Sequence, residues 1–552
     1  APSLSKITQN PTLETYETPR IIPEQTLQTP VNAVQLAHLL ENYNKKRPII
    51  DGFTQGFKIS FKGEECSLSS TNNATANNFP NDVQAKINQE ISLNRISGPY
   101  THHPFPFFKS SPLAIRFKSN GKCRLLHNLS YPYDQRSVNY NISETDSTVR
   151  YASLRDATRL IDRLQPSVFM AKSDIADAFR LIPLHPSQYN YTGFTWKSKF
   201  FFDKCLPMGC SSSCKIFEQF SDSLLWILEN RYDTKNVVKV LDDFLFIEDS
   251  YDKCAAALEN FYDMSQKLGI PIGHHKTVRP TSCLSFLGIE LDAAKMIARL
   301  PQEKIKKYNA AVSKLLLSEK CTLNELQSVI GMLSFATTVI PGGRCFLRRL
   351  HDATIKVKKP YHPIRLRRKI KADLHIWMTF LASYNGITCI SKRKLISSDQ
   401  IHLYSDASTF GYAATLGPGW FQGQWPDSWK SLNIAVLELF PIYLMIKLCS
   451  KRFANTTVLV HCDNKAVTHL LNKQSSKSTE LMAIIRPLVL TLLLDNICLN
   501  ALHLPGKDNT ICDLLSRQTA TLQLIRRFGL EKHPMPVPSS LRPQNFNLKP
   551  YL

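Results

Sequence analysis

The feature that most constrains this chain is a pair of adjacent aspartates, Asp242 and Asp243, with mainly apolar residues on both sides. Residues 237–240 and 244–247 are short runs of the kind that form strands. The pattern therefore predicts a hairpin with the two carboxylates at its tip. Two aspartates in a turn are more often ordinary turn chemistry than a functional site. The pair gains significance only from its neighbours.

A third aspartate, Asp174, follows another apolar strand, predicted over residues 168–172, and an aromatic residue, Phe179, follows it. Residues 206–209 (Leu-Pro-Met-Gly) predict a turn that leads into an amphipathic helix over residues 211–231. Carboxylates at strand ends can hold two divalent ions about 3.5–4 Å apart on a rigid base, as nucleotidyl transfer requires. Magnesium prefers such hard oxygen ligands. The three aspartates are therefore predicted to form a polymerase site.

In this order the segments resemble the motifs of reverse transcriptases. The resemblance implies that Asp174, Asp242 and Asp243 are catalytic and bind two Mg²⁺ ions, with Mn²⁺ as an alternative. It also implies nucleotide-binding roles for Arg116, Lys118 and Arg124 on a hairpin predicted over 111–129, for Phe179 as the side chain that excludes a 2′-hydroxyl, for Met208 in the turn, and for Lys276 facing pyrophosphate. Phe286, Leu287 and Gly288, in a strand predicted over 284–291, resemble the primer grip.

The sequence departs from the family pattern at two places. Val240 stands where the motif usually has Tyr, and Met208 stands where some retroviral enzymes have Gln. Neither is a metal ligand, so these departures put fidelity in question rather than activity. Asp177 also matches a family position, but a turn-capping role agrees equally well with the sequence.

Four further carboxylates follow residue 397. They are Asp406 after a strand predicted over 401–406, Glu438 on a helix over 434–449, Asp463 after a strand over 458–463, and Asp513 on a helix over 510–518. Each alone would be an ordinary surface acid or cap. Together they predict a second catalytic site that binds two Mg²⁺ ions and hydrolyses a phosphodiester. The order of elements resembles the ribonuclease H fold, although Lys507 stands where many such enzymes carry a mobile histidine.

At 552 residues the chain is too long for a single core. The predicted fold class is α/β and α+β multidomain, with a right-hand polymerase of fingers, palm and thumb, a connection, and a C-terminal ribonuclease H-like domain. The predicted divisions are an N-terminal extension at 1–84, fingers and palm at 85–300, a thumb at 301–350, a connection at 351–397, the ribonuclease H-like domain at 398–520, and a basic, proline-rich tail at 521–552.

The net charge of +23 favours a polyanionic partner, most simply nucleic acid, although a merely soluble basic protein would show it too. A basic run at 356–371 is either a solvated linker or a surface that follows a duplex. The 14 cysteines show no CxxC pair, which predicts free thiols and an intracellular location, nucleus or cytoplasm. No apolar run reaches the roughly 18 residues of a membrane span, so no membrane partner is expected.

The linking segments resemble those of the DIRS group of tyrosine-recombinase retrotransposons, over residues 85–518. That resemblance implies an RNA template, a DNA primer, an RNA–DNA hybrid and dNTPs as partners, with an element-encoded recombinase and structural protein. Two alternatives stay open. A domesticated or inactive retroelement-derived protein would only bind nucleic acid, but all seven expected carboxylates are present. An RNA-templated RNA polymerase would conflict with Phe179 and with the ribonuclease H-like pattern.

Overall fold

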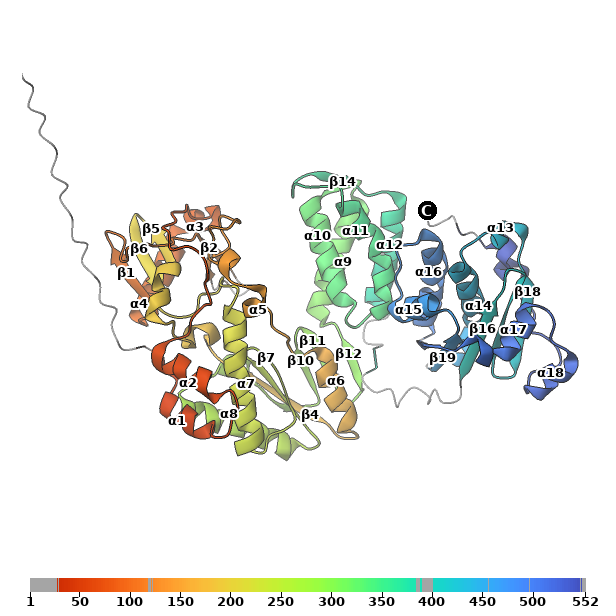
Figure 1. Ribbon diagram of the computed structural model, residues 1–552, viewed down its shortest axis with the longest axis horizontal. Coiled ribbons are helices and arrows are strands. Elements are labelled where there is room, and N and C mark those ends of the chain that lie inside the picture. The colour runs from red at the N-terminus through yellow and green to blue at the C-terminus, as the bar shows by residue number, and fades with distance from the viewer. Residues whose placement is uncertain are drawn as a thin grey trace, which may run out of the picture. The chain divides into compact units, whose positions relative to one another are not determined.

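The chain forms two compact units in this computed structural model (Figure 1). Unit 1 comprises residues 1–157 and 169–281, and unit 2 comprises residues 158–168 and 282–552. The structure describes residues 27, 29–117, 121, 123–383, 388–389, 401–454, 456–495, 497–546 and 548. This division is coarser than the six predicted segments, whose finer boundaries stay a prediction.

The centre of unit 1 is a four-stranded antiparallel sheet in the order β7 (Val237–Val240), β8 (Asp243–Glu248), β4 (Phe169–Asp174) and β9 (Val278–Thr281). Two long helices, α7 (Ser213–Arg231) and α8 (Tyr251–Leu268), pack on this sheet. Their apolar faces bury a run of phenylalanines, which includes Phe217, Phe220, Phe244, Phe246 and Phe261. The predicted 237–247 hairpin and the helix predicted over 211–231 are present.

The N-terminal segment contributes to the same core. Helices α1 (Ala33–Leu39) and α2 (Lys46–Gln55) bury Leu36, Ile49 and Phe53 in one cluster with the α7 and α8 side chains. The Asn32 N–H donates to the Leu268 carbonyl at 2.9 Å. These helices are therefore part of the folded unit.

A smaller region of unit 1 holds the predicted arginine-bearing hairpin. Strands β2 (Leu113–Phe117) and β3 (Cys123–His127) pair antiparallel, as expected. A three-stranded sheet in the order β1 (Ile96–Tyr100), β6 (Lys199–Asp203) and β5 (Gly193–Trp196) lies in the same region. Helices α3 (Ala74–Asn78) and α4 (Pro80–Ser92) complete its core around Ile87, Ile115 and Phe194.

Unit 2 begins with a hairpin where one strand was expected over 284–291. The chain turns back at Leu287 and Gly288, whose φ angles of 49° and 77° suit a two-residue hairpin turn. The result is β10 (Cys283–Phe286) paired with β11 (Ile289–Asp292), with β12 (Ile297–Arg299) and β15 (Thr388–Cys389) beyond. The single-strand prediction was wrong, because the chain reverses direction at Leu287 and Gly288 and the two halves pair with each other.

Helices follow this small sheet in unit 2. Helix α9 (Gln302–Leu317) packs against α10 (Leu323–Ala336) and α12 (Arg368–Ser383), and α11 (Arg348–Thr354) contacts α10 and α12. Short strands β13 (Lys320–Thr322) and β14 (Pro363–Arg365) pair between them. Part of the basic run is therefore folded rather than an unstructured linker.

The last part of unit 2 is a five-stranded sheet in the order β18-β17-β16-β19-β20 (Figure 1). Its strands are β16 (His402–Ala407), β17 (Gly411–Leu416), β18 (Gly419–Gln424), β19 (Thr457–Cys462) and β20 (Cys498–His503). Strands β16, β17 and β18 run antiparallel, whereas β16, β19 and β20 run parallel. The accompanying helices are α14 (Ile434–Cys449), α15 (Lys465–Lys473), α16 (Thr479–Leu494) and α17 (Thr510–Ser516).

Two contacts extend this sheet region. The Arg486 guanidinium of α16 pairs with the Asp373 carboxylate of α12, and both side chains are buried. Beyond residue 520, helix α18 (Leu522–Arg527) buries Ile525, and Trp420 of β18 donates its indole N–H to the Glu531 carbonyl at 2.7 Å. The proline-rich tail thus packs on the sheet over its described part.

The predicted class, α/β and α+β multidomain, is confirmed. Among the helices that the structure describes, none combines the length and the hydrophobicity that crossing a bilayer requires.

Candidate active sites

The register of β4 and β8 places the first three carboxylates together in unit 1. Asp174, the last residue of β4, is the direct partner of Asp243, the first residue of β8. The Ile175 N–H donates to the Asp242 carbonyl at 3.1 Å, which fixes the hairpin tip beside the end of β4. Since all three backbones belong to one hydrogen-bonded sheet edge, their carboxylates are held on a rigid base.

Side chains of α7 form hydrogen bonds with the backbone of the hairpin tip. Leu241, which precedes the aspartate pair, adopts a left-handed φ of 53°, a conformation that costs free energy in a branched residue. Its N–H donates to Glu218 Oε2 at 3.0 Å, and its carbonyl accepts from the Ser221 hydroxyl at 2.6 Å. Lys239 donates to the other oxygen of Glu218 at 2.7 Å, and both side chains are buried. This paired, buried charge holds the turn in place.

The supporting role of Glu218, Ser221 and Lys239 was not predicted from the sequence. Two charges could have indicated it: Lys239 lies within a strand of valines, and Glu218 lies on the apolar face of an amphipathic helix. Charged residues at such positions are rarely buried without a partner.

The segment after α8 supplies a cation and leaves room for the carboxylates. The Gly273 N–H donates to the Asp174 carbonyl at 2.8 Å. A Cβ at Gly273 would lie 2.2 Å from Asp174 Oδ1, so only glycine fits beside this carboxylate. Three residues later, the Lys276 ammonium pairs with Asp174 Oδ2. The structure thus brings Lys276 to the three aspartates, as the family resemblance implied.

Burial and mutual repulsion set the electrostatics of this site. Burial, followed by the charges of Asp243 and Asp174, raises the pKa of Asp242. Burial and the charge of Asp174 raise the pKa of Asp243. Burial alone would lower the pKa of Lys276, but its pairing with Asp174 and the two other carboxylates raises it. The site therefore concentrates negative charge, which Lys276 and, beside Asp243, Lys172 partly offset.

The residues predicted to bind nucleotide occupy several elements of unit 1. Arg116 and Arg124 are direct partners across β2 and β3, and both are exposed. Like charges directly opposite each other weaken a strand pair, so these two arginines suit an anionic ligand. Phe179 is half-buried and packs edge-on against Phe217 of α7, with ring centroids 5.5 Å apart. Met208 is exposed in the predicted turn.

The remaining predicted residues lie elsewhere. Lys118 falls outside the described residues. Phe286, Leu287 and Gly288 form the β10–β11 turn of unit 2, where the Lys304 ammonium of α9 donates to the Gly288 carbonyl at 2.9 Å.

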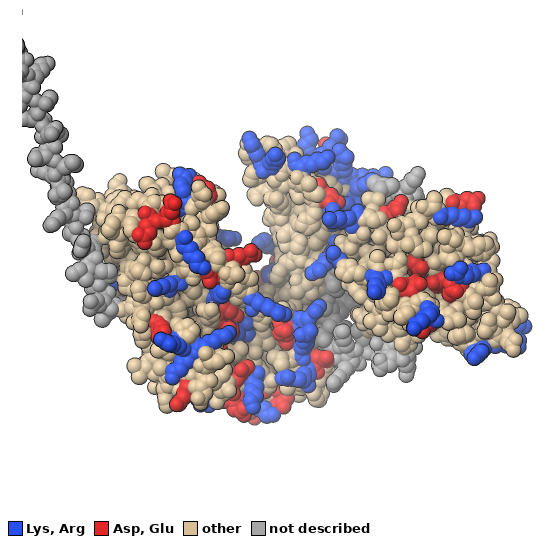
Figure 2. Space-filling model, viewed as in Figure 1, with Lys and Arg blue, Asp and Glu red and all other residues tan. Residues whose placement is uncertain are grey.

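The second carboxylate site gathers side chains from four elements of unit 2. Asp406 lies near the end of β16 and accepts from the Ser516 hydroxyl of α17 at 2.6 Å. Asp463 follows the neighbouring parallel strand β19. Glu438 of α14, Cys462 and Asp463 offer ligand atoms that lie within 4.8 Å of one another. Figure 2 shows acidic side chains gathered over the region of α14 and β16.

Burial and charge repulsion also act at this second site. Burial, followed by the charges of Asp406 and Asp463, raises the pKa of Glu438 to about 9. Burial and the charges of Asp463 and Asp513 likewise raise the pKa of Asp406. Asp513 accepts from the Arg517 guanidinium at 2.8 Å on the same helix. Without a bound cation, Glu438 therefore carries a proton at neutral pH.

The basic run lies beside an open cavity in unit 2. Arg365, Arg367, Arg368, Lys371 and His375, with Glu319, line a cavity of about 820 Å³ around β14 and the start of α12. Figure 2 shows Lys and Arg gathered over this region. Such a concentration of exposed positive charge can bind phosphates without sequence preference.

Parts of the chain, including the region of the three aspartates, are similar to known proteins. Residues 117–291 match the family model described as reverse transcriptase (RNA-dependent DNA polymerase). The enzymatic polyprotein of Cassava vein mosaic virus is 24% identical over 66% of this chain and 54% of its own length. The Pro-Pol polyprotein of feline foamy virus is 24% identical over 40% of this chain and 18% of its own length. The chain therefore spans only about half, or less, of these relatives.

Solved structures of foamy viral protease-reverse transcriptase are also similar. One, in complex with double-stranded DNA, is 16% identical and covers 87% of this chain and 84% of its own, with a TM-score of 0.48. Another, in complex with an RNA/DNA hybrid, is 14% identical and covers 86% of this chain and 63% of its own, with a TM-score of 0.48. Residues 117–291 are therefore similar to the reverse transcriptase domain, and longer stretches of the chain are similar to viral polyproteins.

Proposed function

We propose that this chain is an RNA-directed DNA polymerase whose second unit cleaves the RNA strand of RNA–DNA hybrids. The observation that carries the first activity is the placement of Asp174, Asp242 and Asp243 at one sheet edge, inside the segment that matches the reverse transcriptase family. The second activity is supported by the four carboxylates that converge at the ends of β16 and β19.

Both donor sets fit magnesium. Asp174 Oδ1 and Glu438 Oε2 are buried and have no hydrogen-bond partner among the described residues, which is costly for a carboxylate oxygen unless a cation is bound. We propose that Asp174, Asp242 and Asp243 hold two Mg²⁺ ions, with Mn²⁺ as an alternative. Two more would bind to Asp406, Glu438, Asp463 and Asp513. When bound, such ions lower the pKa of an attacking hydroxyl or water and offset charge on the phosphate.

The protein's own side chains would divide the remaining work of synthesis. Arg116 and Arg124, exposed on one face of their hairpin, would hold the triphosphate of an incoming dNTP. Lys276 would balance or protonate the leaving pyrophosphate, since its ammonium already lies against Asp174. Phe179, fixed against Phe217, would exclude a ribose 2′-hydroxyl. Each role orients or neutralises substrate rather than forming a covalent bond.

The proposed partners follow from these activities. An RNA template, a DNA primer and their hybrid would contact the basic surfaces, and the cavity around β14 and α12 is a suitable place for duplex phosphates. The linking segments support an origin in a DIRS-group retrotransposon. With that origin we propose an element-encoded recombinase and structural protein as further partners.

Primer extension tests the central proposal. The purified chain is incubated with a DNA primer on an RNA template, dNTPs and Mg²⁺, and the same reaction is run with Asp242→Asn. We expect synthesis by the wild type and a loss of at least about 10³-fold in the variant, with hybrid cleavage retained. Asp249→Asn, which alters an exposed aspartate just after β8, should behave like the wild type. A wild type that binds primed RNA but extends nothing would support a domesticated nucleic-acid-binding protein instead.

A further inference from the structure

A chain of alternating charges runs through unit 1 between segments predicted to contact the incoming nucleotide. It starts at Asp177, three residues after the catalytic Asp174, in a left-handed conformation with φ of 52°. The Asp177 carboxylate pairs with the Arg95 guanidinium at 3.0 Å, and Arg95 lies 3.8 Å from Glu90 of α4. The turn after the first catalytic strand is therefore tied to the helix behind it.

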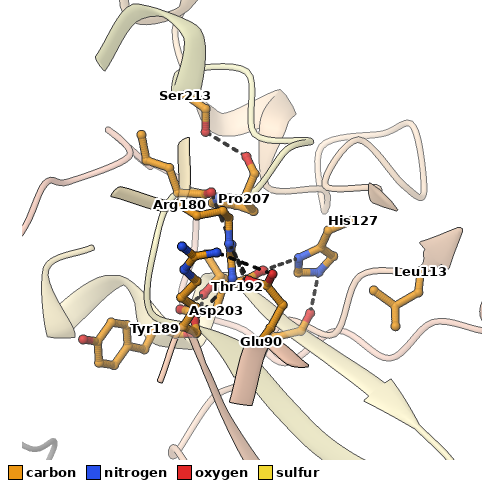
Figure 3. Close-up of polar contacts among 12 residues, drawn as sticks. Glu90, Leu113, His127, Arg180, Tyr189, Thr192, Asp203, Pro207 and Ser213 are labelled. Carbon is orange, nitrogen blue, oxygen red and sulfur yellow. Dashed lines mark hydrogen bonds and ion pairs between the residues drawn. The ribbon is translucent and has the colours of Figure 1, made fainter. Parts of the chain in front are cut away.

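Arg180 is the central residue of this charge chain (Figure 3). Its Nε donates to Glu90 Oε2 at 2.9 Å, and its Nη1 pairs with Asp203 Oδ1 of β6 at 2.8 Å. The same Nη1 donates to the Leu206 carbonyl at 3.3 Å, at the start of the predicted 206–209 turn. One buried guanidinium thus holds the backbone that leads into the turn carrying Met208.

His127 is the last residue of this charge chain. It lies on β3, at the base of the arginine-bearing hairpin (Figure 3). Its Nδ1 lies 3.1 Å from Asp203 Oδ2, and its Nε2 lies 3.0 Å from the Gly193 carbonyl. Both partners are acceptors. Burial alone would raise the pKa of Asp203, but the charge of Arg180 and the hydrogen bond from His127 lower it, so its carboxylate is ionised. The His127 ring therefore lies between two acceptors, one on β6 and one at the start of β5.

Such buried charges cost free energy unless each has its partner, so they fix positions rather than add stability. A cavity of about 170 Å³ lies beside the chain, and its lining includes Lys86, Arg124, His127, Arg180 and Met208. Leu113 and Ile115 pack the hairpin into an apolar core, and the ion pairs and hydrogen bonds add directional contacts beside this cavity.

We propose that this charge chain sets the position of the β2–β3 hairpin relative to the other nucleotide-contacting segments, with His127 as its positioning residue. The inference rests on the proposed polymerase function. His127 would not touch substrate. It would hold the strand that carries Arg124, and so determine how tightly a dNTP triphosphate is bound.

Two substitutions at His127 test the proposal in the full chain. His127→Asn keeps a donor toward Asp203 and loses the contact to the Gly193 carbonyl, whereas His127→Leu loses both contacts. We expect the KM for dNTP to rise about fivefold in the first, the loss typical of one hydrogen bond, and further in the second, with kcat little changed. His102→Asn, an exposed histidine of the same unit, is the matched control.

A second readout separates this inference from the proposed function. Amide hydrogen exchange over residues 113–117 and 123–127 should be faster in both His127 variants than in the wild type, while exchange in α7 stays the same. An unchanged KM in an active enzyme, or unchanged exchange in this hairpin, would overturn the positioning role. If the wild type does not polymerise, the proposed function fails, and the exchange measurement alone still decides the inference.

Discussion

The two carboxylate sites differ in how their negative charge is balanced. In unit 1 the Lys276 ammonium pairs directly with Asp174, at the centre of the three aspartates. In unit 2 Arg517 pairs with Asp513, whereas no salt bridge reaches Glu438 within the described part of the chain. The first site therefore carries a counter-cation of its own. The second holds a proton on Glu438 until a cation replaces it.

This difference follows from how each site is assembled. The aspartates of unit 1 share one sheet edge, and the segment that carries Lys276 returns to that edge after α8. The acids of unit 2 come from two parallel strands and two helices, and Glu438 lies among buried, mainly apolar residues of α14. Burial at the second site is therefore deepest for Glu438, whereas Asp513 is partly exposed.

The largest expected effect tests whether the two carboxylate sites carry separate activities. Glu438→Gln should remove hybrid cleavage by at least about 10³-fold while primer extension continues, since it replaces a metal-binding oxygen with an amide. A labelled RNA–DNA hybrid in Mg²⁺ provides the measurement, and Glu480→Gln on α16 is the matched control. If cleavage survives in the variant, the second site is misassigned.

Removing the counter-cation should affect only the first site. Lys276→Gln is expected to slow nucleotide incorporation by about 10²-fold, as for the loss of one charge-stabilising donor, without changing hybrid cleavage. Single-turnover incorporation measures this effect. Lys267→Gln removes a surface lysine that pairs with Asp263 and should change nothing. Equal losses in both activities would show that Lys276 acts on the fold instead.

Substrate choice sharpens the contrast, because Phe179 at the first site is proposed to discriminate between sugars. Phe179→Val should increase ribonucleotide incorporation relative to deoxynucleotide by about tenfold or more, since the shortened side chain leaves space for a 2′-hydroxyl. Competition between rNTP and dNTP on one template measures the ratio. An unchanged ratio would contradict the proposed role of Phe179.

The smallest expected effect concerns pH and the metal-free protein. Because the pKa of Glu438 is raised to about 9, the folded chain keeps a proton there that the unfolded chain releases above its ordinary value. Stability of unit 2 should therefore fall as pH rises from about 5 to 9, and Mg²⁺ should oppose the fall. Thermal unfolding with and without Mg²⁺ measures it. Glu438→Gln should flatten the metal-free profile, and a flat wild-type profile would contradict the assignment of a buried proton.

Several elements could be predicted because their signals are local. Helix α8 has an N-cap at Ser250 and a left-handed Gly269 at its end, and both residue types are local signals in the sequence. The aspartates sit at strand ends because apolar runs stop there. The Leu287-Gly288 turn was missed because its residues continue an apolar run, and only pairing of β10 with β11 reveals it.

The sequence by itself determined which carboxylates, which strands and which ordered motifs the chain contains, since periodicity and turn residues depend on near neighbours. The tertiary structure alone decided that Glu218 and Lys239 support the catalytic turn, that the N-terminal helices belong to the core, and that Asp177, Arg95, Glu90, Arg180, Asp203 and His127 form one charge chain. Buried ion pairs join residues far apart in sequence. Their energies depend on distance and burial, which a linear pattern does not contain.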